Sequence, residues 1–248
     1  MNEKTLRKEV VEVCHLLYKK GFIAAYDGNV SALINHDRIL ATPSGVCKGF
    51  ITEEDLIVIN SRGEKISGPG KPTSENVLHT LAYQLRNDLG AVVHAHAPMA
   101  IAFSIAGISL TEAILPEIVF TIGSIPTAPY ATPTTAEVAE SVRALLPKHD
   151  AIILAKHGTL TVGKSPLDAY FKVEKIEHTA HVIYCARGLG NVSRLADEEI
   201  QKLQQISPKM GMKTPVLINH DPKVCGENDE NLVRRITALV MKELSENK

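Results

Sequence analysis

Two histidines, His94 and His96, lie two residues apart in the apolar stretch 91–98. In an extended strand successive side chains alternate between faces, so both imidazoles are expected on the same side. Pro98 suits the first turn of a helix, because its missing N–H costs nothing there. The pair should therefore end a strand, where α/β sheets bind their ligands, and it would supply half of a metal site. A chance His-x-His pair that binds nothing is the alternative.

A third histidine, His157, follows the apolar strand expected over 151–155 and directly precedes Gly158. Strand ends of one sheet can converge in one crevice, so His157 can join His94 and His96. Three histidine ligands with an open coordination position are typical of a catalytic Zn²⁺ site. The alternative for His157 is a turn residue that closes its strand without binding metal.

A carboxylate, Glu75, is expected in the first turn of a helix that runs to about Leu85. It can act as a general acid or base beside a metal, or it can simply stabilise the helix dipole. Thr73 and Ser74 should cap this helix, and their hydroxyls together with the free backbone N–H groups form a potential anion site.

Two further stretches, 28–29 and 42–45, offer amide, hydroxyl and backbone donors of the same kind. Neither a Walker-type glycine loop nor a G-x-G-x-x-G stretch occurs. A phosphate bound by these groups would therefore belong to a small substrate more plausibly than to a nucleotide.

His79 lies one helical turn after Glu75 on the same face. It can support the carboxylate from behind, or it can pack the helix against the sheet. Packing is the simpler interpretation, because nothing else in the sequence assigns it chemistry.

The composition argues against several classes of function. The chain has 248 residues, 44% of them hydrophobic, which allows one large α/β domain or two small ones. With 27 Lys+Arg against 28 Asp+Glu there is no basic field for nucleic acid. Apolar runs stay short of the roughly 18 residues of a membrane span. The 4 cysteines form no C-x-x-C pair, as expected for a reduced, cytoplasmic protein.

Periodicity predicts the elements that position these residues. Helices are expected over 4–20, from 98 to 105, from 134 or 135 to 146, and over 165–187. Strands near 29–31 and 39–42 suggest an antiparallel hairpin, 55–59 forms another strand, 116–129 reads as loop and strand, and 151–155 should be central in the sheet. After 191 we expect a helix to about 205, then a surface connection or subunit-packing arm over 207–230, and a final helix over 232–245.

Six motifs occur in the order and rough spacing of the class II aldolase/adducin superfamily, and they look most like its L-fuculose-1-phosphate aldolase branch. They are Gly28-Asn29-Val30-Ser31, Thr42-Pro43-Ser44-Gly45, Pro72-Thr73-Ser74-Glu75, His94-Ala95-His96-Ala97-Pro98, Ala128-Pro129-Tyr130 and His157-Gly158. The resemblance covers about residues 5–190 of a single domain expected over 1–248, and leaves 191–248 as a C-terminal helical extension.

The resemblance implies a three-layer α/β/α sandwich around a central mixed, largely antiparallel sheet. It implies a homotetramer with active sites at subunit interfaces and one Zn²⁺ per subunit, bound by His94, His96 and His157. Glu75 would be the catalytic acid/base and would also be a metal ligand when substrate is absent. The residues that fall where the family binds the substrate phosphate are Asn29, Ser44, Gly45, Thr73 and Ser74.

The implied reaction is the cleavage of a ketose 1-phosphate, a small phosphorylated sugar, into dihydroxyacetone phosphate and an aldehyde through a zinc-stabilised enediolate. A sugar-phosphate epimerase or a decarboxylase of a phosphorylated 3-oxo acid could use the same site. A non-catalytic, adducin-like assembly module is the alternative of another class. Because all three histidines and Glu75 are present, the aldolase is favoured.

The chain departs from the resemblance in its tail after Asn191, which does not match the C-terminal arm of the fuculose enzyme, and in three further places. Thr73 replaces a serine but keeps the hydroxyl, and Tyr26-Asp27 replaces Thr-Ser at the rim of the pocket. The family's catalytic loop tyrosine has no counterpart, since that region reads Leu115-Pro116-Glu117. Glu117 is a candidate proton donor there, and a surface carboxylate is the alternative. The phosphate end of the substrate is therefore better defined than the aldehyde end.

Overall fold

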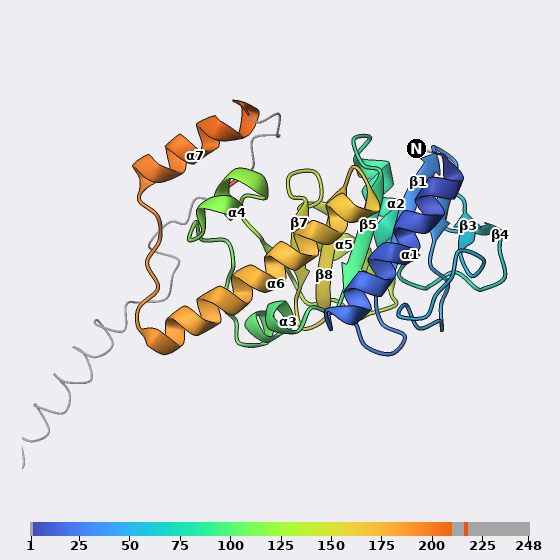
Figure 1. Cartoon of the computed structure of the whole chain (residues 1–248), viewed down its shortest axis with the longest axis horizontal. Helices are drawn as coiled ribbons and strands as arrows, with labels where there is room; N and C mark the ends of the chain where they lie inside the picture. Colours follow the sequence, from blue (N-terminus) through green and yellow to red (C-terminus); the bar gives the residue numbers. More distant parts are fainter. Residues whose placement is uncertain (1, 210–215, 218–248) are drawn as a thin grey trace, which may run out of the picture. The chain divides into compact units, whose positions relative to one another are not determined.

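An eight-stranded sheet with helices on both faces positions the candidate residues (Figure 1). In the computed structural model, which describes residues 2–209, 216 and 217, the strand order is β4-β3-β2-β1-β5-β8-β7-β6. All neighbours are antiparallel except β6 and β7, which are parallel. The strands are β1 (Asn29–Asn35), β2 (Arg38–Ala41), β3 (Ile57–Ile59), β4 (Lys65–Ser67), β5 (Ala91–Ala95), β6 (Thr127–Ala128), β7 (Ala151–Leu154) and β8 (Gly158–Gly163).

The helices are α1 (Glu3–Lys19), α2 (Asn76–Leu85), α3 (Pro98–Ile105), α4 (Pro116–Thr121), α5 (Ala136–Arg143), α6 (Pro166–Leu189) and α7 (Asp197–Lys209). Side-chain alternation divides the core between the two faces of the sheet. Val93 of β5 packs with α1 and α6, whereas its neighbour Val92 packs with α2 and α5. Figure 1 shows α1 and α6 side by side across the first of these faces. The three-layer α/β/α sandwich with a mixed, largely antiparallel sheet is thus confirmed.

Local signals explain where the helices begin. The Asn2 side chain accepts a hydrogen bond from the backbone N–H of Thr5 (2.8 Å), which caps α1. Ser165 caps α6 in the same way, through the backbone N–H of Asp168 (3.3 Å), and Pro166 follows in the first turn. These caps satisfy N–H groups that would otherwise lack a partner inside the helix.

Several expectations are confirmed and four are wrong. The β1–β2 hairpin is antiparallel, and α3 spans 98–105 as predicted. The stretch 116–121 is a helix rather than loop, and 158–163 is a strand that the periodicity did not reveal. Strand β7 lies next to the edge strand rather than at the centre, and it is apolar because helices cover both its faces.

The fourth correction concerns the start of α2. Glu75 is itself the N-cap residue, and no side chain caps the helix. The Thr73 hydroxyl instead accepts from the backbone N–H of Glu75 (3.3 Å), one position before the helix. The Thr73-Ser74 pair is therefore a turn before the helix, and Glu75 stands at the junction between that turn and α2.

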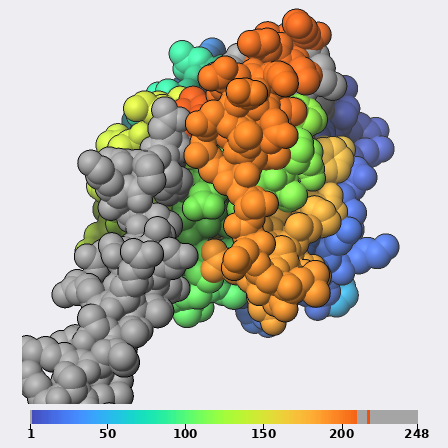
Figure 2. All heavy atoms as spheres, turned by 90° about the vertical axis from the view of Figure 1, so that its left-hand side faces the viewer, coloured from blue at the N-terminus to red at the C-terminus, as the bar shows by residue number. Residues whose placement is uncertain are grey.

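Helix α7 packs on α4, and Figure 2 shows the two in contact on one face of the molecule. Ile200 joins Val119 in a small apolar cluster, and the Ser207 hydroxyl donates to the carbonyl oxygen of Phe120 (2.8 Å). The expected helix over 232–245 and most of the segment 207–230 lie outside the described residues. Among the helices of residues 2–209, none is both long and apolar enough to cross a membrane.

Candidate active site

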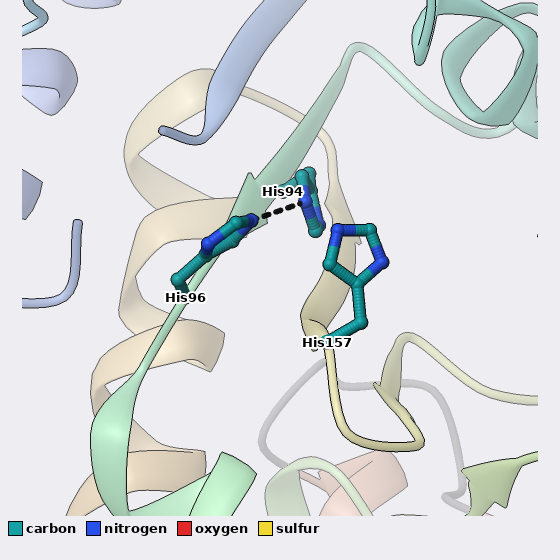
Figure 3. Close-up of side chains that lie close together, drawn as sticks. All are labelled: His94, His96 and His157. Atoms are coloured by element: carbon teal, nitrogen blue, oxygen red, sulfur yellow. Dashed lines mark hydrogen bonds between the residues drawn. The ribbon is translucent and has the colours of Figure 1, made fainter. Parts of the chain in front are cut away.

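The three histidines come together because β5 and β7 run in the same direction. Each of these strands is antiparallel to β8, which lies between them, so their C-terminal ends lie at one edge of the sheet. His94 belongs to β5, His96 follows it, and His157 lies in the turn between β7 and β8. Figure 3 shows the three rings grouped together from these two places. The expected convergence of strand ends is what the fold provides.

The spacing of the ring nitrogens suits a metal ion. One ligand atom from each of His94, His96 and His157 can be chosen so that all lie within 4.8 Å of one another. The Nε2 atoms of His94 and His96 are 3.0 Å apart. Tetrahedral zinc with Zn–N bonds of about 2.0–2.1 Å places its nitrogens about 3.3 Å apart, so modest movements of the rings would complete three bonds.

Polar contacts select the nitrogen that His94 and His96 present to the cluster. Nδ1 of His94 faces the carbonyl oxygen of Thr159 (2.9 Å) and must donate its proton to it. Nε2 is then unprotonated, and its lone pair is free to bind a metal. Nδ1 of His96 lies 3.5 Å from the Asp27 carboxylate, which also favours a proton on Nδ1. Carboxylates and carbonyls orient histidine ligands in this way at metal sites.

Burial keeps these rings neutral. His94 is fully buried, and burial lowers its pKa to about 3, with the Glu75 charge opposing the shift. Burial also lowers the pKa of His96, against the charge of Asp27. Two neutral imidazoles whose unprotonated nitrogens face each other at 3.0 Å repel unless a cation lies between them. The donor set therefore fits a divalent metal.

The Glu75 carboxylate touches the same cluster. Its Oε1 lies 3.1 Å from Nε2 of His157, and its Oε2 lies 3.5 Å from Nε2 of His94. The amide nitrogen of Asn29 donates to Oε2 (2.8 Å). Burial opposes the charge of Glu75, but the hydrogen bonds from His157 and Asn29 outweigh it and lower the pKa of Glu75 below its usual range. A carboxylate ionised beside a metal site can accept or deliver a proton.

Gly158 lets the β7–β8 turn approach β5. A Cβ at Gly158 would lie 2.4 Å from the carbonyl oxygen of Ala95, which is too close for any side chain. The preceding Lys156 has φ +59°, a left-handed conformation that makes the turn tight. The turn thus holds His157 against His94 because the next residue has no side chain.

The start of α3 fixes the other end of the histidine segment. The Glu177 carboxylate of α6 accepts from the backbone N–H groups of Met99 (2.9 Å) and Ala100 (3.0 Å). A carboxylate at a helix N-terminus is favourable both as an acceptor and for the helix dipole. His96 is thereby held between strand β5 and a capped helix.

The residues expected to bind phosphate fall into two groups. The loops 42–45 and 71–74 lie together, because the backbone N–H of Ser44 donates to the carbonyl oxygen of Lys71 (2.9 Å). Ser44, Gly45 and Ser74 are exposed, and Thr73 is partly exposed. Asn29 is buried, and its amide is bonded to Glu75. The structure thus brings the loop residues together at the surface and sets Asn29 behind the carboxylate.

Glu117 lies in the first turn of α4 and is exposed. Lys175 of α6 lies near it: burial lowers the pKa of Lys175, and the Glu117 charge opposes that shift. Within the part of the chain that the structure describes, no hydrogen bond or ion pair joins Glu117 to Glu75 or to a clustered histidine. Among the described residues, the polar contacts of the site therefore do not include Glu117.

Sequence reasoning missed two contributors. Asp27 was noted only at the pocket rim, and it faces His96. His79 was interpreted as a packing residue, but its Nε2 lies 2.5 Å from the amide oxygen of Asn29. The sequence signal for His79 was its spacing of one helical turn from Glu75. That spacing indicates a functional role only together with Asn29, which lies between the two side chains.

Known proteins share this arrangement of elements. The chain matches the family model of the class II aldolase and adducin N-terminal domain over residues 8–184. It is 37% identical over 180 residues to an L-fuculose phosphate aldolase of Methanococcus maripaludis, covering 73% of this chain and 96% of the relative. It is 32% identical over 187 residues to a 3-oxo-tetronate 4-phosphate decarboxylase of Pectobacterium atrosepticum, covering 74% and 85%.

Among solved structures, YgbL from Klebsiella pneumoniae, described broadly as an aldolase/epimerase/decarboxylase, superposes with a TM-score of 0.76 at 31% identity. The match covers 82% of this chain and 99% of YgbL. Sequence and structure therefore agree over most of the chain, including both segments that carry the histidine cluster. The chain belongs to the class II aldolase and adducin family.

Proposed function

We propose that this chain, a lyase-type enzyme of the class II aldolase superfamily, is a zinc-dependent aldolase that cleaves a ketose 1-phosphate into dihydroxyacetone phosphate and an aldehyde. The observation that carries the proposal is the contact of Glu75 with two of three clustered histidines. An ionised carboxylate directly beside a candidate metal site suits proton transfer at a carbon next to a polarised carbonyl.

The roles of the residues follow from their positions. His94, His96 and His157 would hold the metal, which supplies Lewis-acid stabilisation of negative charge on substrate oxygens when bound. The loops 42–45 and 71–74, in which Ser44, Gly45 and Ser74 are exposed, would bind the phosphate through hydroxyl and backbone N–H donors. Binding the phosphate at a distance from the reacting carbons orients the substrate and supplies binding energy for the reaction.

Glu75 then handles the proton of the reacting carbon. As the C3–C4 bond of the ketose breaks, the C4 hydroxyl gives its proton to a base, the role expected of Glu117, and becomes the aldehyde. The electron pair of the broken bond passes to C3, forming the enediolate. Glu75, which takes up a proton from solvent beforehand, delivers it to C3 and so completes dihydroxyacetone phosphate, and in the reverse direction the ionised carboxylate removes that proton.

A decarboxylase of a phosphorylated 3-oxo acid is the second candidate. One observation favours it, namely that Glu117, the expected proton donor, makes no hydrogen bond or ion pair with Glu75 or the histidines among the described residues. Loss of CO₂ needs no acceptor for a hydroxyl proton, whereas aldol cleavage does. For the aldolase, Glu117 would have to come from a neighbouring subunit, as expected for a homotetramer with sites at its interfaces.

Two parallel assays separate the candidates. The metal-loaded protein is offered a panel of 1-phosphorylated ketoses, with release of dihydroxyacetone phosphate measured, and a 3-oxo acid phosphate, with CO₂ measured. We expect dihydroxyacetone phosphate from the ketoses and its loss in Glu75→Gln and His157→Ala. Release of CO₂ alone would replace the aldolase by the decarboxylase. Full activity in either variant would refute the assigned site.

Metal analysis of the purified protein tests the finer parts of the proposal. We expect one zinc per subunit, removable by a chelator, in a cytoplasmic homotetramer. A protein that neither binds a stoichiometric metal nor turns over any of these substrates would be a non-catalytic assembly module, as in adducin.

A further inference from the structure

A chain of hydrogen bonds runs from Glu75 into the core between strand β1 and helix α2. The Asn29 carboxamide lies between Glu75 and His79, with Nδ2 2.8 Å from Oε2 of Glu75 and Oδ1 2.5 Å from Nε2 of His79. On its other side, Nδ1 of His79 lies 2.7 Å from the Ser31 hydroxyl, which lies 2.9 Å from the hydroxyl of Tyr83. The carboxylate is therefore connected to four buried or partly buried side chains behind it.

The direction of every bond follows from the carboxylate. An ionised Glu75 can only accept, so the Asn29 amide must turn its NH₂ group toward it. The carbonyl oxygen of Asn29 then faces His79 and requires a proton on Nε2. A neutral ring protonated at Nε2 has its lone pair on Nδ1, which accepts from Ser31, and the phenol of Tyr83 donates to Ser31.

His79 is suited to stay in that one state. It is 1% exposed, and burial lowers its pKa to about 4 against the opposing charge of Glu75. A cationic ring would carry a proton on Nδ1 and lose Ser31 as a donor. The other tautomer would leave Nε2 without a proton and facing the amide oxygen of Asn29, which costs free energy at a buried site.

We propose that His79 is a positioning residue, which fixes the orientation of the Asn29 carboxamide and through it the carboxylate of Glu75. Asn29 and Ser31 are two residues apart on β1 and face the same side of the strand, where His79 of α2 bonds to both. Without a donor at His79, nothing in this chain of bonds prevents the amide from turning its oxygen toward Glu75. The effect on activity rests on the function proposed above.

Two substitutions of His79 separate positioning from packing. The amide nitrogen of glutamine can take the place of Nε2, so His79→Gln keeps a donor for Asn29. Asparagine is shorter and reaches only the place of Nδ1, so His79→Asn keeps a partner for Ser31 and removes the donor for Asn29. Both variants are polar and smaller than histidine in the same buried site, which makes them a matched pair.

We expect kcat for dihydroxyacetone phosphate release to fall about 10–100-fold in His79→Asn, the range found for residues that orient catalytic or metal-binding groups. KM should change by less than about threefold, and His79→Gln should restore kcat to within about threefold of the parent. Melting temperature and bound metal are measured for both variants. Equal losses of kcat in the two variants would show a packing role and overturn the proposal.

A measurement on the parent protein is independent of catalysis. Nitrogen-15 NMR of the imidazole ring reports which nitrogen carries the proton, and we expect His79 as the neutral Nε2–H form between pH 6 and 8. A proton on Nδ1, or a cationic ring, would overturn the proposal even if the enzyme is active. If the parent releases neither dihydroxyacetone phosphate nor CO₂, the proposed function fails, while the NMR result still decides the orientation of Asn29.

Discussion

Replacing Gly158 by alanine tests whether the β7–β8 turn has to lie against β5 for the histidines to meet. The new Cβ would lie 2.4 Å from the carbonyl oxygen of Ala95. It would also lie 3.1 Å from Cε1 of His94 and 3.2 Å from Cδ2 of His96. Close carbon–oxygen contacts in proteins are about 3.3–3.6 Å, so the turn must retreat by roughly 1 Å. His157, the preceding residue, must move with it.

The cost can be bounded from that overlap. Overpacking of a filled interior typically costs about 1–3 kcal/mol. The turn can relax in the metal-free protein, but metal binding would pull it back toward β5. The strain energy is then present only in the metal-bound protein, so it lowers the metal affinity. A difference of 1.4 kcal/mol is tenfold, so the affinity should fall by about 5- to 140-fold. Competition with a chromophoric chelator measures the affinity, and thermal unfolding of the metal-free protein reports the strain that does not relax.

Gly188 provides the matched control. It lies near the end of α6, and a Cβ there would meet nothing within 4 Å. Gly188→Ala should bind metal like the parent and be no less stable, because alanine is the better helix former by about 0.8–1.0 kcal/mol. If Gly158→Ala kept both the metal affinity and the melting temperature of the parent, the turn would not be what places His157, and the reasoning would fail.

Three further predictions concern residues around the site. Asp27→Asn should weaken metal binding about tenfold, since it removes the carboxylate that faces Nδ1 of His96, and an unchanged affinity in the chelator assay would contradict this. His79 has a pKa of about 4 in the fold against an ordinary 6.5, so the unfolded chain binds more protons between these values. The contribution of neutral His79 to stability is complete above pH 6.5 and is lost as the pH falls toward 4. Between pH 7 and pH 5, the free energy of unfolding of the metal-free parent, measured in urea, should fall by about 2 kcal/mol more than that of His79→Gln. Equal decreases in the two proteins would refute this prediction. Ser165→Ala should cost about 1 kcal/mol of unfolding free energy through the lost α6 cap, measured in urea, with no change in metal affinity.

The candidate metal ligands could be predicted because their signals are local. Alternation along an extended strand puts His94 and His96 on one side, and an apolar run that ends at a histidine marks a strand end. Strand β8 joins the segment with His94 and His96 to the turn with His157, and this strand was not predicted. Threonine alternates with apolar side chains between two glycines in this strand. It was not predicted because the first glycine marks the end of the preceding apolar strand.

The errors elsewhere have similarly specific causes. The stretch 116–121 carries a proline at its first helical position, a signal for a helix start, but it is short and follows irregular chain. Thr73 and Ser74 suit a helix cap by residue type, yet the helix begins only at Asn76, with Glu75 as its N-cap residue. Propensity identified the residues of the junction correctly, and only the backbone could show which of them stands at the cap.

The hydrogen bonds behind Glu75 could not be predicted at all. His79 and Asn29 are far apart in the sequence, and their contact depends on how α2 lies across β1. Long-range contacts of this kind follow from the packing of whole elements, on which single-residue patterns carry little information.

The position of β8 between β5 and β7 also determines the order in which the strands can pair while the chain leaves the ribosome. Until residues 158–163 have left the ribosome, β5 pairs only with β1, and its other edge, next to His94, is open. An open apolar edge invites pairing with other chains, so the nascent protein is most exposed to misassembly in this interval. His157 directly precedes β8, and the pairing of β8 with β5 brings it to His94, so the three histidines meet at the step that closes the sheet. A metal that needs all three ligands would therefore bind only after this last strand has been inserted.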